Sequence, residues 1–359
     1  MRPLHTLSGT PHYFLDRVHL FGKHHSTILL NAGRLEIIIF QTRITEMLGI
    51  KYPIVGGTMM WIMTPEFTAA VSNAGGLGIL ASAMYESREA FAEAVDRVLD
   101  LTDRPFAVNI NLFPMMRPID NNDYLDVLIE KGVKIVETSG HSAPADLCAR
   151  FKEAGMIWIH KCVGVRYALK VQDMGADIIT VVGYENGGAT GKLDIGTLVL
   201  VPRLAETVKV PLIGGGGVSD SRGFLAVLAL GAQGVIIGTR LLATQEAPIH
   251  ENLKKALVQA SELDTMLIMR SIGATHRVWV NAAANECAEL EADQADLPEI
   301  LKVVAGEKAK MMYDRGDLDV GIISCGQGVG MVHDIPTVKE LFDGIIAQAT
   351  DIAKKLAGN

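Results

Sequence analysis

Two glycine-rich segments in the second half of the chain have the composition of phosphate-binding loops. Gly214 to Gly217 are consecutive glycines after one short apolar run, and Gly238-Thr239-Arg240 follows the next such run. Glycine suits this task because it has no Cβ to hold backbone N–H groups away from phosphate oxygens. One glycine run also occurs in ordinary tight turns, but two after successive runs favour a phosphate site. We expect the N-terminus of a helix starting near Asp220 to contribute to it.

Polar residues end several other apolar runs, and together they suit a flat amphipathic ring. Asn109-x-Asn111 ends one run, Lys161 lies at the end of another, and Gly183-Tyr-Glu-Asn-Gly-Gly188 follows a third. Amides would bind the polar edge of the ring, Gly57-Thr-Met-Met60 would cover it, and Lys161 would stabilise negative charge. Flavin has these requirements, because its N1/O2 edge becomes negative on reduction. Each of these residues also has a structural alternative to cofactor binding. Lys161 would form a salt bridge to Glu137, and Asn111 would cap a loop.

These polar segments all follow members of one series of short apolar runs. Each run has the length of a strand, and the gaps between runs are long enough for crossover helices. Continuous apolar runs are typical of buried parallel strands, and eight units in series predict an α/β fold, a closed (β/α)8 TIM barrel. Active sites of such barrels lie at the carboxyl ends of the strands. The runs are Pro53–Gly57, Leu77–Ala81, Phe106–Leu112, Ile135–Ser139, Ile157–Cys162, Ile178–Gly183, Pro211–Gly216 and Gly234–Thr239.

Capping residues and glycines predict helices between and after the runs. One expected helix has Thr64 as its N-cap and Pro65 as its first residue, and several others stop at a glycine. The expected helices are Pro65–Asn73, Ser87–Leu101, Ala143–Ala154, Val165–Met174, Ser221–Leu230, Ile249–Leu263 and Val338–Leu356.

The chain divides into four expected parts. Residues 1–40 are expected to form an extension without a fixed structure. Alternatively, they result from a start codon assigned too far upstream. They hold five of the ten histidines, but no spacing there supports a metal site. Residues 41–263 form the barrel, and 264–333 form a mostly helical insertion that caps one side of it. Residues 334–359 form a C-terminal helix that packs on the barrel.

The overall composition argues against several classes of protein. The chain has 359 residues, 49% of them hydrophobic, which suffices for one barrel with additions. Its net charge of −8 disfavours nucleic acid and anionic membranes as partners, because both select basic surfaces. No apolar run approaches the roughly 20 residues of a membrane-spanning helix. The four cysteines lack a CxxC spacing and are expected to be reduced, as in the cytoplasm. A homodimer is an open alternative.

Seven motifs together resemble the nitronate monooxygenase (2-nitropropane dioxygenase-like) family of FMN-dependent barrels. The resemblance extends from about Phe40 to Leu356. Ile268–Ser271 and Gly316–Gly321 are most similar to the branch with NADH:quinone reductases, in which NADH or NADPH would be a co-substrate. The seven motifs are Pro53–Trp61, Asn73–Gly76, Arg104–Asn109, Ile159–Cys162, Gly183–Gly188, Gly214–Gly217 and Ile237–Arg240.

The resemblance implies roles for individual residues. Gly187 and Gly188 would face a small-molecule substrate. His141, which follows the fourth run, is a further substrate-site candidate from its place in the chain, with an ordinary loop residue as the alternative. The FMN contacts implied by the resemblance or by strand position are Gly57, Thr58, Met59, Met60, Asn111, Lys161, Gly215, Gly216, Gly217, Gly238 and Thr239.

One position departs from the family pattern. The family usually carries histidine directly after the paired small residues of the sixth strand loop, and Ala189 occupies that position here. Alanine cannot remove a carbon-bound proton, so oxidation of neutral nitroalkanes by that route is doubtful. Glu185 would replace the base if burial raised its pKa, although binding of the ribityl chain or of a loop amide is an equal alternative.

These observations predict an FMN-dependent oxidoreductase, with Lys161 and Glu185 as catalytic candidates and oxidation of alkyl nitronates by O2 as the leading activity. NAD(P)H:quinone reduction and flavin-dependent enoyl-thioester reduction are the alternatives. A catalytically silent FMN-binding protein is the alternative from another class. His160 is expected to be structural, and Arg270, His276 and Arg277 are expected to be solvated surface residues rather than an anion site.

Overall fold

The computed structural model describes residues 40–112, 120–140 and 143–358. Its main sheet has eight parallel strands in the order β1-β9-β8-β6-β5-β4-β3-β2. The sheet closes between its first and last strands, because Gly56 N–H donates to Leu77 O at 2.9 Å and Leu77 N–H donates to Ile54 O at 2.9 Å. The strands are β1 (Ile54–Gly56), β2 (Gly78–Ala81), β3 (Phe106–Asn111), β4 (Ile135–Ser139), β5 (Ile157–Cys162), β6 (Ile178–Val182), β8 (Leu212–Gly215) and β9 (Gly234–Ile237).

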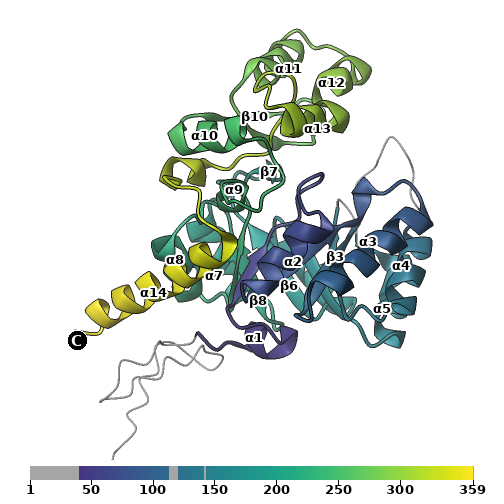
Figure 1. Ribbon diagram of the computed structural model, residues 1–359, viewed down its shortest axis with the longest axis vertical. Helices are drawn as coiled ribbons and strands as arrows, with labels where there is room; N and C mark the ends of the chain where they lie inside the picture. The colour runs from purple at the N-terminus through teal and green to yellow at the C-terminus, as the bar shows by residue number, and fades with distance from the viewer. Residues whose placement is uncertain (1–39, 113–119, 141–142, 359) are drawn as a thin grey trace, which may run out of the picture.

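Helices alternate with these strands and surround the barrel (Figure 1). The last helix of the chain, α14 (Val338–Leu356), packs on α8 and α2. Its N-terminus carries a reciprocal capping box between Thr337 and Glu340. The helices that accompany the barrel are α1 (Arg43–Leu48), α2 (Pro65–Asn73), α3 (Arg88–Leu101), α4 (Asn121–Glu130), α5 (Ala145–Glu153), α6 (Val165–Asp173), α7 (Thr197–Ala205), α8 (Ser221–Ala229), α9 (Thr239–Leu242) and α10 (Glu251–Gln259), with short 3-10 turns at Ser82–Met84 and Gln327–Met331.

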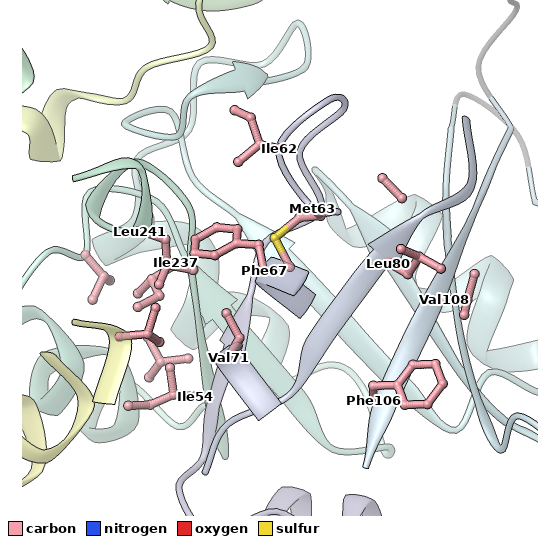
Figure 2. Packing of buried hydrophobic residues seen from close by; sticks show 14 of the residues in the cluster. Ile54, Ile62, Met63, Phe67, Val71, Leu80, Phe106, Val108, Ile237 and Leu241 are labelled. Carbon is pink, nitrogen blue, oxygen red and sulfur yellow. The ribbon is translucent and has the colours of Figure 1, made fainter. Parts of the chain in front are cut away.

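Alternation along each strand sends side chains to two separate cores. Inward residues such as Val55, Ile79 and Ile213 fill the barrel, together with Ile44 from helix α1. Outward residues pack against the helices, and Figure 2 shows part of this layer. Because both faces of each strand are buried, the strands read as continuous apolar runs. The labelled residues of the figure are Ile54, Ile62, Met63, Phe67, Val71, Leu80, Phe106, Val108, Ile237 and Leu241.

A cap subdomain, residues 264–323, lies at the end of the barrel near β7 and α9 (Figure 1). It has a small core of its own that includes Ile268, Val278 and Ile300. Its hairpin is joined to the barrel by β7 (Gly188–Ala189), which pairs antiparallel with β11. The cap elements are β10 (Thr265–Ile268), β11 (His276–Trp279), α11 (Ala282–Ala292), α12 (Leu297–Val304) and α13 (Gly306–Arg315).

The structure confirms the TIM-barrel prediction and places a strand in every one of the eight apolar runs. The predicted seventh and eighth strands are β8 and β9, because β7 is a short strand outside the barrel. Phe40, which we placed in the extension, is buried with its ring centroid 5.2 Å from that of Phe224. The rest of the predicted extension lies outside the described residues. All four cysteines are free, and no helix in the described ranges is long and apolar enough to cross a membrane.

Candidate active site

The predicted site residues converge at one end of the barrel. Lys161 lies at the end of β5, Asn111 at the end of β3, and Gly238 directly after β9. Thr58 follows β1, and Gly187 lies between β6 and β7. Because all eight strands are parallel, these positions share the carboxyl-end face of the barrel. His141 lies outside the described residues, so its predicted role stays a prediction.

The glycines after β8 are required by the protein itself. Gly216 has a φ of +103° and Gly217 a φ of +75°, both in the region that favours glycine. A Cβ on Gly216 would lie 2.6 Å from Thr197 Oγ1 and 2.8 Å from Gly183 N. A Cβ on Gly215 would lie 2.4 Å from the side chain of Ile236. Close packing of neighbouring loops therefore explains these glycines without a ligand.

Gly238 is different, because no neighbouring segment of the described protein crowds the position of a Cβ there. Its φ is −125°, outside the left-handed region. A Cβ built on it would have a single heavy atom within 4 Å, Met59 Sδ at 3.9 Å. The backbone of Gly238 and Thr239 is partly exposed at the barrel mouth. This open space beside a bare backbone, next to the glycines of β8, fits a phosphate-bearing cofactor such as FMN.

Two charged groups that the sequence places beside the glycines serve the fold. The Asp220 carboxylate accepts hydrogen bonds from the amides of Arg222 and Gly223, so it occupies the N-terminus of α8. These hydrogen bonds disfavour a phosphate at this helix end, although its contribution to phosphate binding stays a prediction. Arg240 is buried, forms an ion pair with Asp334, and donates to the carbonyl of Ala243 at 3.1 Å. Its guanidinium anchors the segment before α14 to the barrel.

Lys161 has no carboxylate counter-ion at this face among the residues that the structure describes. Its side chain is half-buried at the end of β5. Within the described ranges it forms no ion pair, so the predicted alternative, a salt bridge to Glu137, is not present. A half-buried ammonium without a carboxylate partner attracts developing negative charge more strongly than a solvated one.

Glu137 organises the polar floor of the mouth. This fully buried carboxylate accepts hydrogen bonds through Oε2 from Thr58 Oγ1 at 2.6 Å and from Asn109 Nδ2 at 2.7 Å. Asn109 also donates to Ser139 Oγ at 3.1 Å. The second carboxylate oxygen, Oε1, is buried without a partner in the described part of the chain. Glu137 thus fixes the orientation of Thr58, one of the predicted FMN contacts.

We expect Glu137→Ala to lower the free energy of unfolding by about 1–3 kcal/mol, because it removes the acceptor of the hydrogen bonds from Thr58 and from the buried Asn109. Glu137→Gln should cost less, since its side-chain oxygen still accepts both hydrogen bonds. Urea unfolding followed by circular dichroism measures both values. Equal losses for the two variants would show that these hydrogen bonds do not determine stability here.

The carboxylate of Glu185 caps the start of helix α7. It accepts hydrogen bonds from Thr197 N at 2.9 Å and from Thr197 Oγ1 at 2.8 Å. The N-cap residue Gly196 has no side chain, so Glu185 supplies the missing cap from the strand loop. These contacts favour the loop-amide alternative over a general base, although catalysis by Glu185 stays a prediction.

The loop after β1 brings the cap and the barrel together. Trp61 has a φ of +66°, an uncommon backbone conformation for a bulky residue. A Cβ on Gly306, the first residue of α13, would lie 3.3 Å from Trp61 Nε1 and 3.9 Å from Met60 Cε. Met60 itself is 40% exposed. The predicted apolar cover at Met59 and Met60 therefore lies between the barrel mouth and the cap.

The expectation that His276 and Arg277 are solvated surface residues is wrong. Arg277 is buried, lies over the ring of Tyr184 with 4.4 Å to the centroid, and donates to Tyr184 O at 3.1 Å. His276 is half-buried and pairs with Ala189 in the β11–β7 register. Only Arg270 matches the expectation, in an exposed ion pair with Asp194 at 2.8 Å.

His276 lies against the predicted substrate side of the mouth. Its Nε2 is 2.9 Å from Ser324 Oγ. A Cβ on Gly188 would lie 3.6 Å from the same Nε2. Burial, and secondarily the charge of Lys161, lowers the pKa of His276 to about 4, so its imidazole is neutral at physiological pH. From the sequence we considered His276 only as part of an anion patch, because its position beside Gly188 depends on pairing between distant segments.

His160, in contrast, is structural, as predicted. It is buried in the barrel wall with Nδ1 2.7 Å from Thr138 Oγ1. Burial lowers its pKa to about 4. Trp158 Nε1 donates to the same hydroxyl at 2.7 Å, so His160 belongs to a network below the outer helices.

Comparison with known proteins defines the class. The nitronate monooxygenase family model matches residues 41–126 and 115–348, so the chain belongs to the nitronate monooxygenase family and is an oxidoreductase.

Individual relatives carry several names. The chain is 33% identical to (3aS,4S,5R,7aS)-5-hydroxy-7a-methyl-1-oxo-octahydro-1H-indene-4-carboxyl-CoA dehydrogenase of Rhodococcus jostii, over 86% of this chain and 96% of that protein. It is 28% identical to a probable nitronate monooxygenase of Staphylococcus saprophyticus, over 88% of this chain and 99% of the other. The solved structure of FabK from Thermotoga maritima superposes with a TM-score of 0.82 at 33% identity, covering 89% of this chain and 99% of FabK.

Proposed function

We propose that the protein is an FMN-dependent oxidoreductase that acts on the carbon–carbon bond beside the carbonyl of an acyl-CoA thioester. The observation that carries the proposal is a barrel mouth with a cation, Lys161, that has no ion-pair partner in the described ranges, and an open backbone at Gly238. The substrate class is supported by the R. jostii relative, which is named a carboxyl-CoA dehydrogenase and matches along nearly its whole length.

The residues at the mouth would have three roles toward FMN. The backbone at Gly238, Thr239 and the β8 glycines would hold the phosphate, and Asn111 and Thr58 would bind polar atoms of the ring. Lys161 would stabilise negative charge at the N1/O2 edge. When bound, FMN supplies an acceptor or donor of two electrons with a hydride at N5.

The protein would orient the thioester between this mouth and the cap. Gly187 packs against the Cys325–Gly326 backbone, since a Cβ there would lie 2.7 Å from Gly326 N, and Gly188 would face the substrate beside Ser324 and His276. The cap, whose α13 contacts the Met60–Trp61 loop, would exclude water from the reacting carbons. The electron partner sets the physiological direction. With O2 as the acceptor, the enzyme would oxidise the acyl chain of the thioester. With a reduced nicotinamide as the donor, it would reduce that chain.

Oxidation of alkyl nitronates with O2 is the second candidate. It is favoured by the relatives named probable nitronate monooxygenase, although these are less similar than the CoA dehydrogenase. A nitronate is already an anion and needs no general base, so Ala189 does not oppose this chemistry. The same cation, Lys161, would bind it.

The anaerobic visible spectrum of the purified protein tests these candidates. We expect a bound flavin whose absorbance bleaches on addition of a saturated acyl-CoA or, in the reducing direction, of NADH or NADPH. Bleaching by an alkyl nitronate alone would favour the second candidate. A colourless protein that does not bind added FMN would overturn the cofactor assignment, and a flavin that no donor reduces would indicate a silent binding protein.

A further inference from the structure

The short pairing between β7 and β11 places two side chains beside each other. In this antiparallel pair, Ala189 is directly opposite His276. Directly opposed residues point to the same face of a sheet, with Cβ atoms about 5 Å apart. An imidazole on residue 276 therefore reaches the space that a side chain on residue 189 would occupy.

We propose that His276 supplies the proton-transferring imidazole of this active site from the cap, in place of a side chain at Ala189. This inference rests on the proposed function, and it assigns to His276 the removal of the α-proton of the thioester. His276 is then a catalytic residue contributed by the hairpin of the cap subdomain, not by the barrel.

The contacts of His276 suit a neutral base. Ser324 is its hydrogen-bond partner, at 2.9 Å from Nε2. We assign the tautomer in which Nε2–H donates to Ser324 Oγ, which leaves the lone pair on Nδ1. Lys161 is the charged group that acts on the ring from β5. No carboxylate in the described ranges hydrogen-bonds to it, so the imidazole is neutral before the reaction, and the imidazolium formed by proton transfer would be stabilised by the adjacent enolate.

The proposed proton transfer needs no group beyond the substrate, His276 and Lys161. The Cα–H bond of the thioester breaks, its proton passes to Nδ1 of His276, and its electron pair moves onto the thioester carbonyl as an enolate. Lys161, whose positive charge reaches His276, would stabilise that negative charge. Since this step moves no electrons off the substrate, it proceeds without an oxidant and can be measured by itself.

A purely structural role is the competing explanation. In that case the hydrogen bond between His276 and Ser324 would only tie the hairpin to the segment before the 3-10 turn Gln327–Met331. Both explanations predict some loss of activity on mutation, so loss of turnover does not separate them. Proton exchange does, because it reports the chemical step.

The experiment measures exchange of α-protons into D2O by NMR. Phenylacetyl-CoA is the probe, since its α-protons are acidic and it has no β-carbon able to give a hydride. Nitroethane serves as a second carbon acid that carries no thioester. Both are incubated with the holoprotein and, in parallel, with protein stripped of flavin, which removes redox turnover from the readout.

We expect His276→Asn to slow enzyme-dependent exchange at least about 100-fold, the usual contribution of a general base, with flavin content and circular dichroism unchanged. Added imidazole should restore exchange to His276→Ala. The double variant Ala189→His with His276→Asn should also regain exchange, because the new imidazole lies on the same sheet face. The matched control is His250→Asn, a half-buried histidine outside the site whose N-cap role asparagine retains.

The outcomes separate the two proposals. Wild-type-like exchange in His276→Asn would overturn the role of His276 and leave the proposed function intact. Exchange of nitroethane but not of the thioester, lost in His276→Asn, would support His276 and overturn the thioester assignment. If the wild-type protein exchanges neither carbon acid, the role of His276 is overturned whatever the anaerobic spectrum shows.

Discussion

A Gly238→Val protein should fold as the wild type does and bind FMN roughly 100-fold more weakly. The valine has room in the protein, because Met59 Sδ at 3.9 Å is the single heavy atom within 4 Å of its Cβ position. That space is the one we assign to the cofactor. Overpacking and the loss of a charge-assisted phosphate contact each cost about 1–3 kcal/mol, which together reach the expected change in affinity.

The measurement is the dissociation constant of FMN for flavin-stripped protein, from quenching of flavin fluorescence. Gly344→Val is the matched control: Gly344 lies in α14 with nothing within 4 Å of its Cβ position, so FMN affinity should not change. Unchanged affinity in Gly238→Val, with the same thermal midpoint as wild type, would show that the cofactor does not approach this backbone.

The contrast with Gly216 explains why a substitution at Gly238 is the informative test of cofactor binding. A Cβ on Gly216 would collide with Thr197 and Gly183, and its φ of +103° is strained for other residues. Substitution there would damage the fold and the site together. A glycine whose Cβ position is empty is better evidence of a ligand than one whose Cβ position is filled by the protein.

The barrel could be predicted because its signals are local. Strands buried on both faces are continuous apolar runs, and β4 and β5 have the predicted bounds. Helix α2 begins at the predicted Pro65 after Thr64, whose hydroxyl accepts a hydrogen bond from Phe67 N. The position of Lys161 at the carboxyl end of β5 followed from the same reasoning.

Helix α7 shows where local signals fail. We did not predict it, since it starts after Gly196, which has no capping side chain, and contains Pro202 in its interior. Its cap comes from Glu185, eleven residues before Gly196. The same fact left the two predictions for Glu185 open, since its hydrogen bonds to Thr197 at the helix start are visible only after the chain has folded.

The cap hairpin shows a second kind of failure. The strands β10 and β11 have four residues each, too short for a reliable period, and β7 has two. Their register depends on packing between segments almost ninety residues apart in the chain. We expected His276 and Arg277 to be solvated because they lie in a segment predicted to be mostly helical, and the pairing of β11 with β7 and β10 overturned that expectation.

Lys161→Met should slow anaerobic reduction of the bound flavin by about 10²–10³-fold, the cost of removing one preorganised charge-stabilising group. Methionine keeps much of the apolar stem and removes the charge. In the described ranges Lys161 has no ion-pair partner, so the substitution leaves no buried carboxylate unpaired. The loss should therefore appear in chemistry rather than in stability, and the reduction potential of the flavin should fall.

Stopped-flow reduction and potentiometry measure these effects, with Lys170→Met, an exposed lysine of α6, as the matched control. A further readout does not involve the cofactor. Because Lys161 helps burial to hold the pKa of His276 near 4, removing its charge should raise that pKa toward 6.5, though burial keeps it below. NMR titration of the imidazole measures it. Wild-type reduction rates in Lys161→Met would exclude contact with the cofactor, and an unchanged His276 pKa would separate Lys161 from the cap histidine.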